Sequence, residues 1–312
     1  MQTFEEMLAQ RKQQYNKNIL PTMKRMAKIF KKENKPYKLL NEQVQHVGWS
    51  LACENVQHLL EFEEFLTSLS SCENTISTDK NWTAPDLALV INPETRQNPV
   101  SSEFVNRVYN TTAQRSAGKG EILVSLLCGD AEKTIVKHAD VCIRNKNIEL
   151  KADIGTIHQE EENKFRQYDK LLKETFNLKP KEIKEAYKTY HPLPTLLLNG
   201  KDAANFYSKL YRNWNSDKLD IIEKVWNEFE DPDIRSQELG YLVLCDYVSH
   251  KNIDGILLTE QQKDGKIKAV YITDLTDKKF IFENITMKPQ KMRSGSTEAR
   301  PDGLVNISIS MK

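Results

Sequence analysis

Cysteine and histidine are both sparse in this chain of 312 residues, and neither occurs in a metal-binding spacing. The five cysteines form no C-x-x-C pair; they are Cys53, Cys72, Cys128, Cys142 and Cys245. Structural zinc sites and disulfide frameworks need closely and regularly spaced cysteines, so the sequence excludes both. We expect reduced and mostly buried thiols, as in a cytosolic protein.

Long apolar runs are also missing. A transmembrane helix needs about 20 consecutive apolar residues, and no stretch of the sequence approaches that length. The first residues resemble a charged helix and not the apolar centre of a signal peptide. The sequence therefore predicts a cytoplasmic protein that has no membrane partner.

The chain has almost no net charge, because 45 lysines and arginines nearly balance 44 aspartates and glutamates. With a formal charge of +1, the whole chain does not attract a polyanion. Any nucleic-acid surface must therefore come from local basic clusters. Three segments qualify, each with a solvated surface or a flexible connector as its alternative: residues 24–38, the loop 110–120 and residues 288–300.

A short apolar run after two glycines is the centre of our interpretation. Gly118, Lys119 and Gly120 precede Glu121, and apolar residues at 122, 123, 126 and 127 then recur at helical spacing. The pattern predicts an amphipathic helix with Glu121 in its first turn. The helix dipole favours a glutamate there in any protein, so a purely structural role for Glu121 is the alternative.

Two strand-like segments come next along the chain. Residues 140–143 and 148–151 flank the polar turn 144–147, which is the pattern of a β-hairpin. Side chains alternate along a strand, so Glu149 and Lys151 project from the same face. If Asp140 begins the neighbouring strand, two carboxylates and one amine converge. The alternative is an ordinary hairpin with solvated charges on one face.

Paired carboxylates beside a lysine suit phosphodiester chemistry. Carboxylate oxygens are hard ligands for Mg²⁺, which keeps open positions for water and phosphate oxygens. Such a metal polarises a phosphodiester and lowers the pKa of a bound water, while a nearby lysine orients or deprotonates that water. We therefore expect Asp140 and Glu149 to ligate Mg²⁺ or Mn²⁺.

The order of a helix glutamate, an aspartate and a Glu-x-Lys pair resembles the PD-(D/E)xK nuclease superfamily, also known as the restriction-endonuclease-like fold. The positions that match its motif are Glu121, Asp140, Glu149 and Lys151. The resemblance implies a metal-dependent hydrolase that cleaves DNA phosphodiester bonds. It also implies that Asp140 and Glu149 ligate the metal and that Lys151 handles the attacking water. Glu121 then binds a metal through water or orients the site.

The Gly-Lys-Gly-Glu opening and the motif spacing look most like nucleases carried by bacteriophages. This resemblance implies DNA as the partner and the host cytoplasm as the location. The proline that usually precedes the aspartate is Ala139 here, and the Gln-x-x-x-Tyr element of the RecB-like branch is absent after Lys151. A second hypothesis is a phage head, neck or tail protein that keeps this fold in the virion. Its partners are other phage proteins or copies of itself.

The chain as a whole predicts an α/β protein with a mixed β-sheet. We expect a mainly helical N-terminal region over residues 1–110, followed by a restriction-endonuclease-like core over residues 111–312 with a helical insertion at about 180–250. Besides the hairpin, the expected strands are residues 87–91, 134–136, 255–259, 267–272, 280–285 and 304–309.

The remaining helices follow from apolar periodicity and from capping residues. They are expected at residues 4–15, 22–30, 41–69, 104–109, 160–178, 180–190, 202–214, 216–229 and 233–248. Ser216 and Asp233 are the expected N-caps of the last two. The aromatic residues between Phe206 and Phe229 recur at helical spacing, which predicts core packing.

Overall fold

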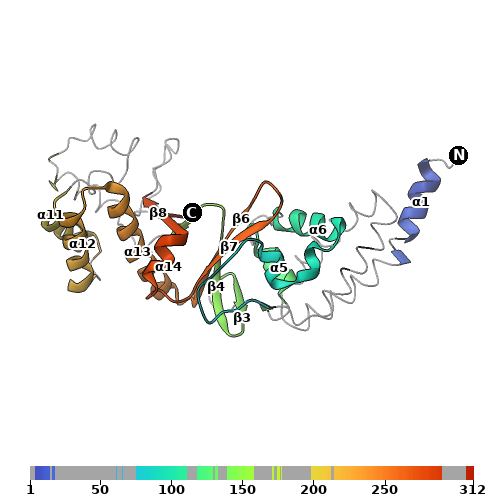
Figure 1. The fold of residues 1–312 in the computed structure, drawn as a ribbon, viewed down its shortest axis with the longest axis horizontal. Coiled ribbons are helices and arrows are strands. Elements are labelled where there is room, and N and C mark those ends of the chain that lie inside the picture. Colours follow the sequence, from blue (N-terminus) through green and yellow to red (C-terminus); the bar gives the residue numbers. More distant parts are fainter. Residues whose placement is uncertain are drawn as a thin grey trace. The chain divides into compact units, whose positions relative to one another are not determined.

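The computed structural model divides into two compact units, which are described separately here (Figure 1). Unit 1 comprises residues 1–153, 252–277 and Met311, and unit 2 comprises residues 154–251, 278–310 and Lys312. The structure describes residues 4–14, 16–17, 61, 65, 75–110, 118–128, 131–132, 139–157, 171, 174–175, 177, 198–211, 214–289 and 307–312. The first described element is the helix α1 (Phe4–Gln14).

Unit 1 is built on a six-stranded mixed β-sheet with the strand order β1-β7-β6-β4-β3-β2. The strands are β1 (Trp82–Ala84), β2 (Ala131–Glu132), β3 (Val141–Ile143), β4 (Lys146–Ala152), β6 (Gly255–Gln261) and β7 (Ile267–Ile272). Neighbouring strands are antiparallel, except that β4 and β6 run parallel. The predicted α/β class with a mixed sheet is confirmed. Because β1 joins this sheet, the observed division differs from the expected boundary at residue 110.

The predicted hairpin is present in this sheet, and the strands predicted at 255–259 and 267–272 form a second one. Arg144 and Asn145 join β3 to β4 with φ angles of 50° and 62°, the left-handed conformation that a tight hairpin turn requires. Gly265, with φ 84°, lies in the turn between β6 and β7. The strand β4 pairs with β3 on one side and with β6 on the other, where Lys151 lies opposite Leu258. The strand with the Glu-x-Lys pair is therefore an internal strand of the sheet.

Residues 87–91, predicted as a buried strand, form the helix α5 instead (Leu87–Ile91). The spacing of a five-residue apolar run does not distinguish a buried strand from a buried helix. Capping decides the outcome here. The Asp86 carboxylate accepts a hydrogen bond from the Ala88 N–H at 3.2 Å, and the Asn92 N–H donates to the Ala88 carbonyl at 2.8 Å.

Three more helices of unit 1 surround the core: the 3₁₀ helix η2 (Pro93–Arg96), α6 (Pro99–Asn110) and α7 (Glu121–Leu127). The helix predicted to begin at Glu121 is confirmed as α7, and its residues from Ile122 to Leu127 are all buried. The same apolar core contains Ile148 and Leu150 of β4. One face of β4 is therefore held in place by apolar packing.

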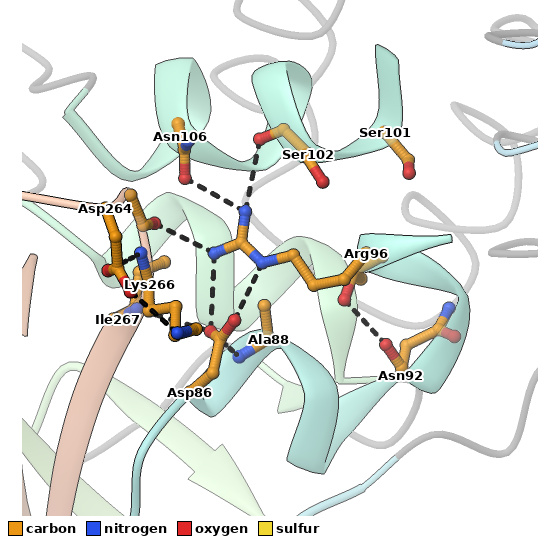
Figure 2. Close-up of polar contacts among 12 residues, drawn as sticks. Asp86, Ala88, Asn92, Arg96, Ser101, Ser102, Asn106, Asp264, Lys266 and Ile267 are labelled. Carbon is orange, nitrogen blue, oxygen red and sulfur yellow. Dashed lines mark hydrogen bonds and ion pairs between the residues drawn. The ribbon is translucent and has the colours of Figure 1, made fainter. Parts of the chain in front are cut away.

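A buried ion pair links α5 to the turn between β6 and β7 (Figure 2). Asp86 is 2% exposed, and its carboxylate accepts from Arg96 Nε at 2.8 Å and from Nη2 at 3.3 Å. The guanidinium also donates to the carbonyls of Gly265 and Ser102 and to Asn106 Oδ1. Since both charged groups are fully engaged with protein atoms, we assign this network to stability and not to chemistry.

Unit 2 combines a three-stranded sheet with helices. Its described elements are β5 (Gly155–Ile157), α11 (Gly200–Leu210), α12 (Ser216–Glu228), α13 (Pro232–Lys251), α14 (Lys278–Asn284), β8 (Ile285–Pro289) and β9 (Ile307–Met311). The strand order is β5-β9-β8. The Gln237 side chain of α13 donates to the Ile285 carbonyl at 2.7 Å and accepts from the Met287 N–H at 2.9 Å. These two hydrogen bonds fix β8 on α13.

The predicted aromatic core of unit 2 is present. Tyr211 and Trp214 stack with ring centroids 4.3 Å apart, and Trp226 is 2% exposed. Phe229 is the exception, because it is 41% exposed at the end of α12. Arg235 lies over the Trp226 ring and donates to the carbonyls of Trp226 and Phe229, both at 2.5 Å. This guanidinium satisfies carbonyls that the end of a helix leaves unpaired.

One predicted strand of unit 2 is wrong. Residues 280–284 belong to the helix α14 (Lys278–Asn284), and β8 begins only at Ile285. The apolar run Phe280, Ile281 and Phe282 is compatible with either a strand or a helix, and Ile281 is the residue of this helix that is buried. The segment predicted as a strand at 304–309 is confirmed in its second half as β9.

The two predicted N-caps lie one or two residues too far along the chain. Asn215 caps α12 in place of Ser216, because its side-chain oxygen accepts from the Lys218 N–H at 3.2 Å. The carboxylate of Asp231 accepts from the N–H of Asp233 at 2.8 Å at the start of α13. Asp233 thus lies in the first turn and not at the cap.

Some predictions fall outside the described residues. They are the helices at 22–30 and 180–190, the strand at 134–136, and most of the helical segments 41–69 and 160–178. Most of the three basic segments also lies there.

Candidate active site

Asp140 lies just before β3 and binds β4 through its main chain and its side chain. Its N–H donates to the Ile148 carbonyl at 3.0 Å, and its Oδ2 accepts from the Leu150 N–H at 2.6 Å. Val141 pairs with Ile148, so the antiparallel register continued by one residue places Asp140 opposite Glu149. Opposite residues of an antiparallel pair share a face of the sheet. The geometry therefore places these two carboxylates side by side.

Glu149 and Lys151 lie two residues apart on β4 and contact each other. They alternate with Ile148 and Leu150, which belong to the core, so they share the opposite face of the strand. Lys151 Nζ donates to Glu149 Oε1, and Glu149 is 7% exposed. The hairpin with simply solvated charges is therefore wrong for Glu149. A buried carboxylate needs partners to offset its lost hydration, and Lys151 is one of them.

Glu121 is the first residue of α7 and folds back over the preceding turn. Its Oε1 accepts from the Gly118 N–H at 2.6 Å, and its own N–H donates to the Gly118 carbonyl at 3.3 Å. A Cβ added to Gly118 would lie 2.6 Å from Glu121 Oε1, so only a glycine leaves room for the carboxylate. The first of the two glycines therefore serves the placement of Glu121.

Gly120 brings the start of α7 against Tyr109 of α6. It has φ 87°, and a Cβ there would lie 3.2 Å from the Tyr109 ring and 3.4 Å from Thr259 Oγ1. The Gly120 N–H donates to the Tyr109 carbonyl at 3.0 Å, and the Tyr109 hydroxyl donates to Thr259 Oγ1 at 3.1 Å. Burial raises the pKa of Tyr109 to about 12, so the hydroxyl stays protonated at neutral pH. These contacts tie the start of α7 to β6.

The charges of the motif residues affect the pKa values of two of their carboxyls, Asp140 and Glu121. Burial, together with the charges of Glu149 and Glu121, raises the pKa of Asp140 to about 7, against the opposing effects of the Leu150 N–H and Lys151. Burial also raises the pKa of Glu121, with a contribution from Glu149, against the Gly118 N–H and Lys151. Because the charges of Glu149 and Lys151 affect the carboxyls of both Glu121 and Asp140, the four residues lie in one neighbourhood. The structure thus brings together all the predicted site residues.

The carboxylates have the right chemistry for a hard cation but point toward internal donors. Oxygens of Asp140, Glu149 and Glu121 accept from Leu150 N–H, Lys151 and Gly118 N–H, respectively. In the part of the chain that the structure describes, no three His, Cys, Asp or Glu side chains are placed to hold a metal ion. Mg²⁺ is usually bound by one or two carboxylates and keeps several waters, so Asp140 and Glu149 suffice as a donor set.

Sequence reasoning missed the residues that support the site. Tyr109 and Thr259 are 150 residues apart in sequence, and no local pattern links them. Asp153, which forms an ion pair with Lys119, follows Lys151 by two residues, and no local pattern links it to Lys119. Lys119 itself was noted for its charge in the loop 110–120.

Comparisons of the chain with protein-family models, with curated proteins and with solved structures found no match. The resemblance to the PD-(D/E)xK superfamily therefore stays a prediction that rests on the motif. None of the helices in the described ranges is both long and apolar enough to cross a membrane.

Proposed function

We propose that this chain is a divalent-metal-dependent nuclease that hydrolyses DNA phosphodiester bonds at a PD-(D/E)xK-type site. One observation carries the proposal: residues from α7, from the start of β3 and from β4 gather at one place. Asp140 lies opposite Glu149 and is bound by the Leu150 N–H, and Glu149 is bound by Lys151. Glu121 lies close enough for the charges of Glu149 and Lys151 to affect its pKa. Carboxylates that repel one another at close range attract cations, because a cation relieves the repulsion. A lysine in the same place provides the amine that phosphodiester hydrolysis uses.

Each residue has a proposed role. Asp140 and Glu149 are the ligands of Mg²⁺ or Mn²⁺, and Glu121 acts through a water molecule or orients the site. The bound metal supplies Lewis-acid activation of the phosphodiester and a water of lowered pKa. Lys151 orients the attacking water, with its ammonium directed by Glu149 Oε1. The Leu150 N–H holds the Asp140 carboxylate in position at 2.6 Å, which limits the reorganisation that binding needs.

The arrangement of unit 1 supports a restriction-endonuclease-like core. The helix α7, the strand β3 and the strand β4 follow one another in the order that the motif requires. The strand β4 is internal, with β3 antiparallel on one side and β6 parallel on the other. Internal strands position their side chains rigidly, which suits a site that must hold reacting groups within a fraction of an ångström.

The test is cleavage of supercoiled plasmid and of labelled oligonucleotides by the purified chain in Mg²⁺, Mn²⁺ or EDTA. We expect nicking in either metal, none in EDTA, and a loss of about 100-fold or more in Asp140→Asn, Glu149→Gln and Lys151→Ala. Glu121→Gln should lose activity while it keeps the acceptor for Gly118. The control is Glu103→Gln, which alters an exposed i,i+4 pair with Arg107. Equal activity in all variants would trace the cleavage to a contaminant and end the proposal.

A structural or assembly role in a phage particle is the second candidate. The observation that favours it is that each site carboxylate is already bonded to an internal donor, as in a site that has become part of the scaffold. This candidate predicts the chain inside purified virions, with or without metal-dependent cleavage by the isolated protein. The two functions are compatible, so the cleavage assay and the particle analysis answer separate questions.

A further inference from the structure

An ion pair lies beside the candidate site and has no role in the hydrolysis described above. Lys119 Nζ binds Asp153 Oδ2 at 2.9 Å and lies 5.0 Å from the centre of the Tyr109 ring. Lys119 stands two residues before Glu121, and Asp153 stands two residues after Lys151. The pair therefore connects the two segments that carry the helix glutamate and the proposed catalytic lysine.

The backbone holds both partners firmly. Asp153 adopts a left-handed conformation with φ 58°, and its N–H donates to the Thr259 carbonyl of β6 at 2.8 Å. A non-glycine residue in this conformation persists only where its surroundings fix it. On the other side, Lys119 lies between Gly118, which binds Glu121, and Gly120, which binds Tyr109. The positions of both side chains are thus set by the same contacts that place the site.

The side chains themselves remain accessible to solvent. The Lys119 side chain is 27% exposed and that of Asp153 is 50% exposed. An ion pair in this setting contributes little net stability, because water and salt screen it. A phosphate of DNA can therefore replace Asp153 as the partner of the ammonium with only a small loss of free energy.

We propose that Lys119 binds a DNA phosphate next to the scissile one, and that Asp153 holds its ammonium in the DNA-free protein. This inference rests on the proposed nuclease function. The chain spans at most about 3.6 Å per residue, so the Cα atom of Asp153 lies within about 7 Å of that of Lys151, a length of about two nucleotides at 3.4 Å each. The Tyr109 ring stabilises the ammonium by a cation–π interaction, which does not compete for the hydrogen bonds of the ammonium.

A purely structural clamp makes the opposite prediction for one of the two partners. If the pair only fixes α7, then the loss of either residue weakens DNA binding. If Lys119 takes a phosphate that Asp153 competes for, removing Lys119 weakens binding and removing Asp153 strengthens it. The sign of the Asp153 effect therefore decides between the two roles.

The experiment measures binding of a fluorescein-labelled single strand and of the matching duplex by anisotropy, in EDTA and again in Ca²⁺, across a salt series. We expect Lys119→Gln to raise Kd about eightfold at 0.1 M salt and to lower the salt slope by about 0.7 to 0.9. Asp153→Asn should lower Kd by about two- to fivefold, the range typical of an exposed ion pair. In the double variant Kd should equal that of Lys119→Gln alone.

The matched control is Lys146→Gln at the opposite end of β4, about 16 Å from Lys151 by strand rise. Lys146 also pairs with an aspartate, Asp254, at 3.5 Å and is similarly accessible. It should leave Kd unchanged. A higher Kd in Asp153→Asn, or an unchanged Kd in Lys119→Gln, overturns the inference. Neither result affects DNA binding and cleavage by the wild type, so the nuclease proposal is kept. Absence of DNA binding by the wild type overturns the nuclease proposal together with this one.

Discussion

At the scale of single residues, Asp140 is subject to opposing influences. The Leu150 N–H and Lys151 favour its ionised form, while burial and the charges of Glu149 and Glu121 favour the neutral acid. Burial and the two negative charges have the larger effect, and the pKa of Asp140 rises to about 7 from an ordinary value of 3.8. Since the unfolded chain releases this proton near pH 4, folding and protonation are linked over the range between these two values.

The first prediction concerns the pH dependence of stability. Between pH 4 and pH 7 the folded chain holds a proton on Asp140 that the unfolded chain has released, so stability falls as the pH rises. The contribution is complete below about pH 4 and is lost by about pH 7, with an upper limit of about 4 kcal/mol. Asp140→Asn keeps an acceptor for Leu150 and should flatten this profile in urea unfolding. The exposed Asp264→Asn serves as control, and an identical profile in Asp140→Asn would refute the assignment.

Lys151 gives a second prediction at this scale. Lys151→Met removes a positive charge next to Glu149, which is 7% exposed and bound to it. Leaving a buried carboxylate without this ammonium should cost about 1–3 kcal/mol of unfolding free energy. The combined Glu149→Gln and Lys151→Met variant should lose less than the sum of the single variants, because the two residues are coupled. Strict additivity in urea unfolding would show that the two groups act independently.

At the scale of elements, the two glycines before α7 should have separable effects. Gly120→Ala places a Cβ in a left-handed residue and 3.2 Å from the Tyr109 ring, which should cost about 1–2 kcal/mol of stability. Gly118→Ala meets only the Glu121 carboxylate, at 2.6 Å, and should displace it with a smaller loss of stability. Cleavage should therefore fall more in Gly118→Ala, and thermal stability more in Gly120→Ala. The reverse order would contradict this assignment.

Elements with strong local signals could be predicted from the sequence, and elements decided by distant or subtle contacts could not. The hairpins β3–β4 and β6–β7 combine alternating apolar residues with turn residues, and both are present. The apolar run 87–91 is compatible with a strand or a helix. The side-chain cap of Asp86 makes it a helix, and the apolar run itself does not indicate this. The partner of β1 is β7, far along the chain, and no pattern in β1 indicates this pairing.

The same distinction applies to the site. Glu121, Asp140, Glu149 and Lys151 could be identified because they lie within one short segment with recognisable element types. The contact between Tyr109 and Thr259 and the left-handed backbone of Asp153 depend on β6, which no local pattern relates to the motif. Their contribution became visible only once the parallel β4–β6 pairing was known.

At the scale of the whole molecule, an arginine with little exposure binds its own surroundings in the described part of each unit. Arg96 pairs with the buried Asp86 in unit 1, whereas Arg235 binds main-chain carbonyls in unit 2. Arg96→Met should cost about 3–5 kcal/mol, because it leaves a buried charge unpaired. Arg235→Met should cost at least about 1.5–3 kcal/mol through lost charged hydrogen bonds.

The two losses should appear in different unfolding transitions. Fluorescence of variants that keep only Trp82 reports on unit 1, and variants that keep only Trp214 and Trp226 report on unit 2. We expect Arg96→Met to shift the first signal and Arg235→Met the second. Equal shifts of both signals in both variants would show that the units unfold as one cooperative body.

The parallel pairing of β4 with β6 also determines when the six-stranded sheet can form during synthesis of the chain. About a hundred residues of chain separate the paired strands, including the whole 154–251 segment of unit 2. They must be made before this pairing can close. The motif residues from Glu121 to Lys151 therefore leave the ribosome early, while the strand that Asp153 and Tyr109 bind emerges late. Until then one side of β4 is an open edge that exposes unpaired backbone groups to other chains. A nascent chain thus carries the proposed chemical groups for some time before it has the sheet that aligns them.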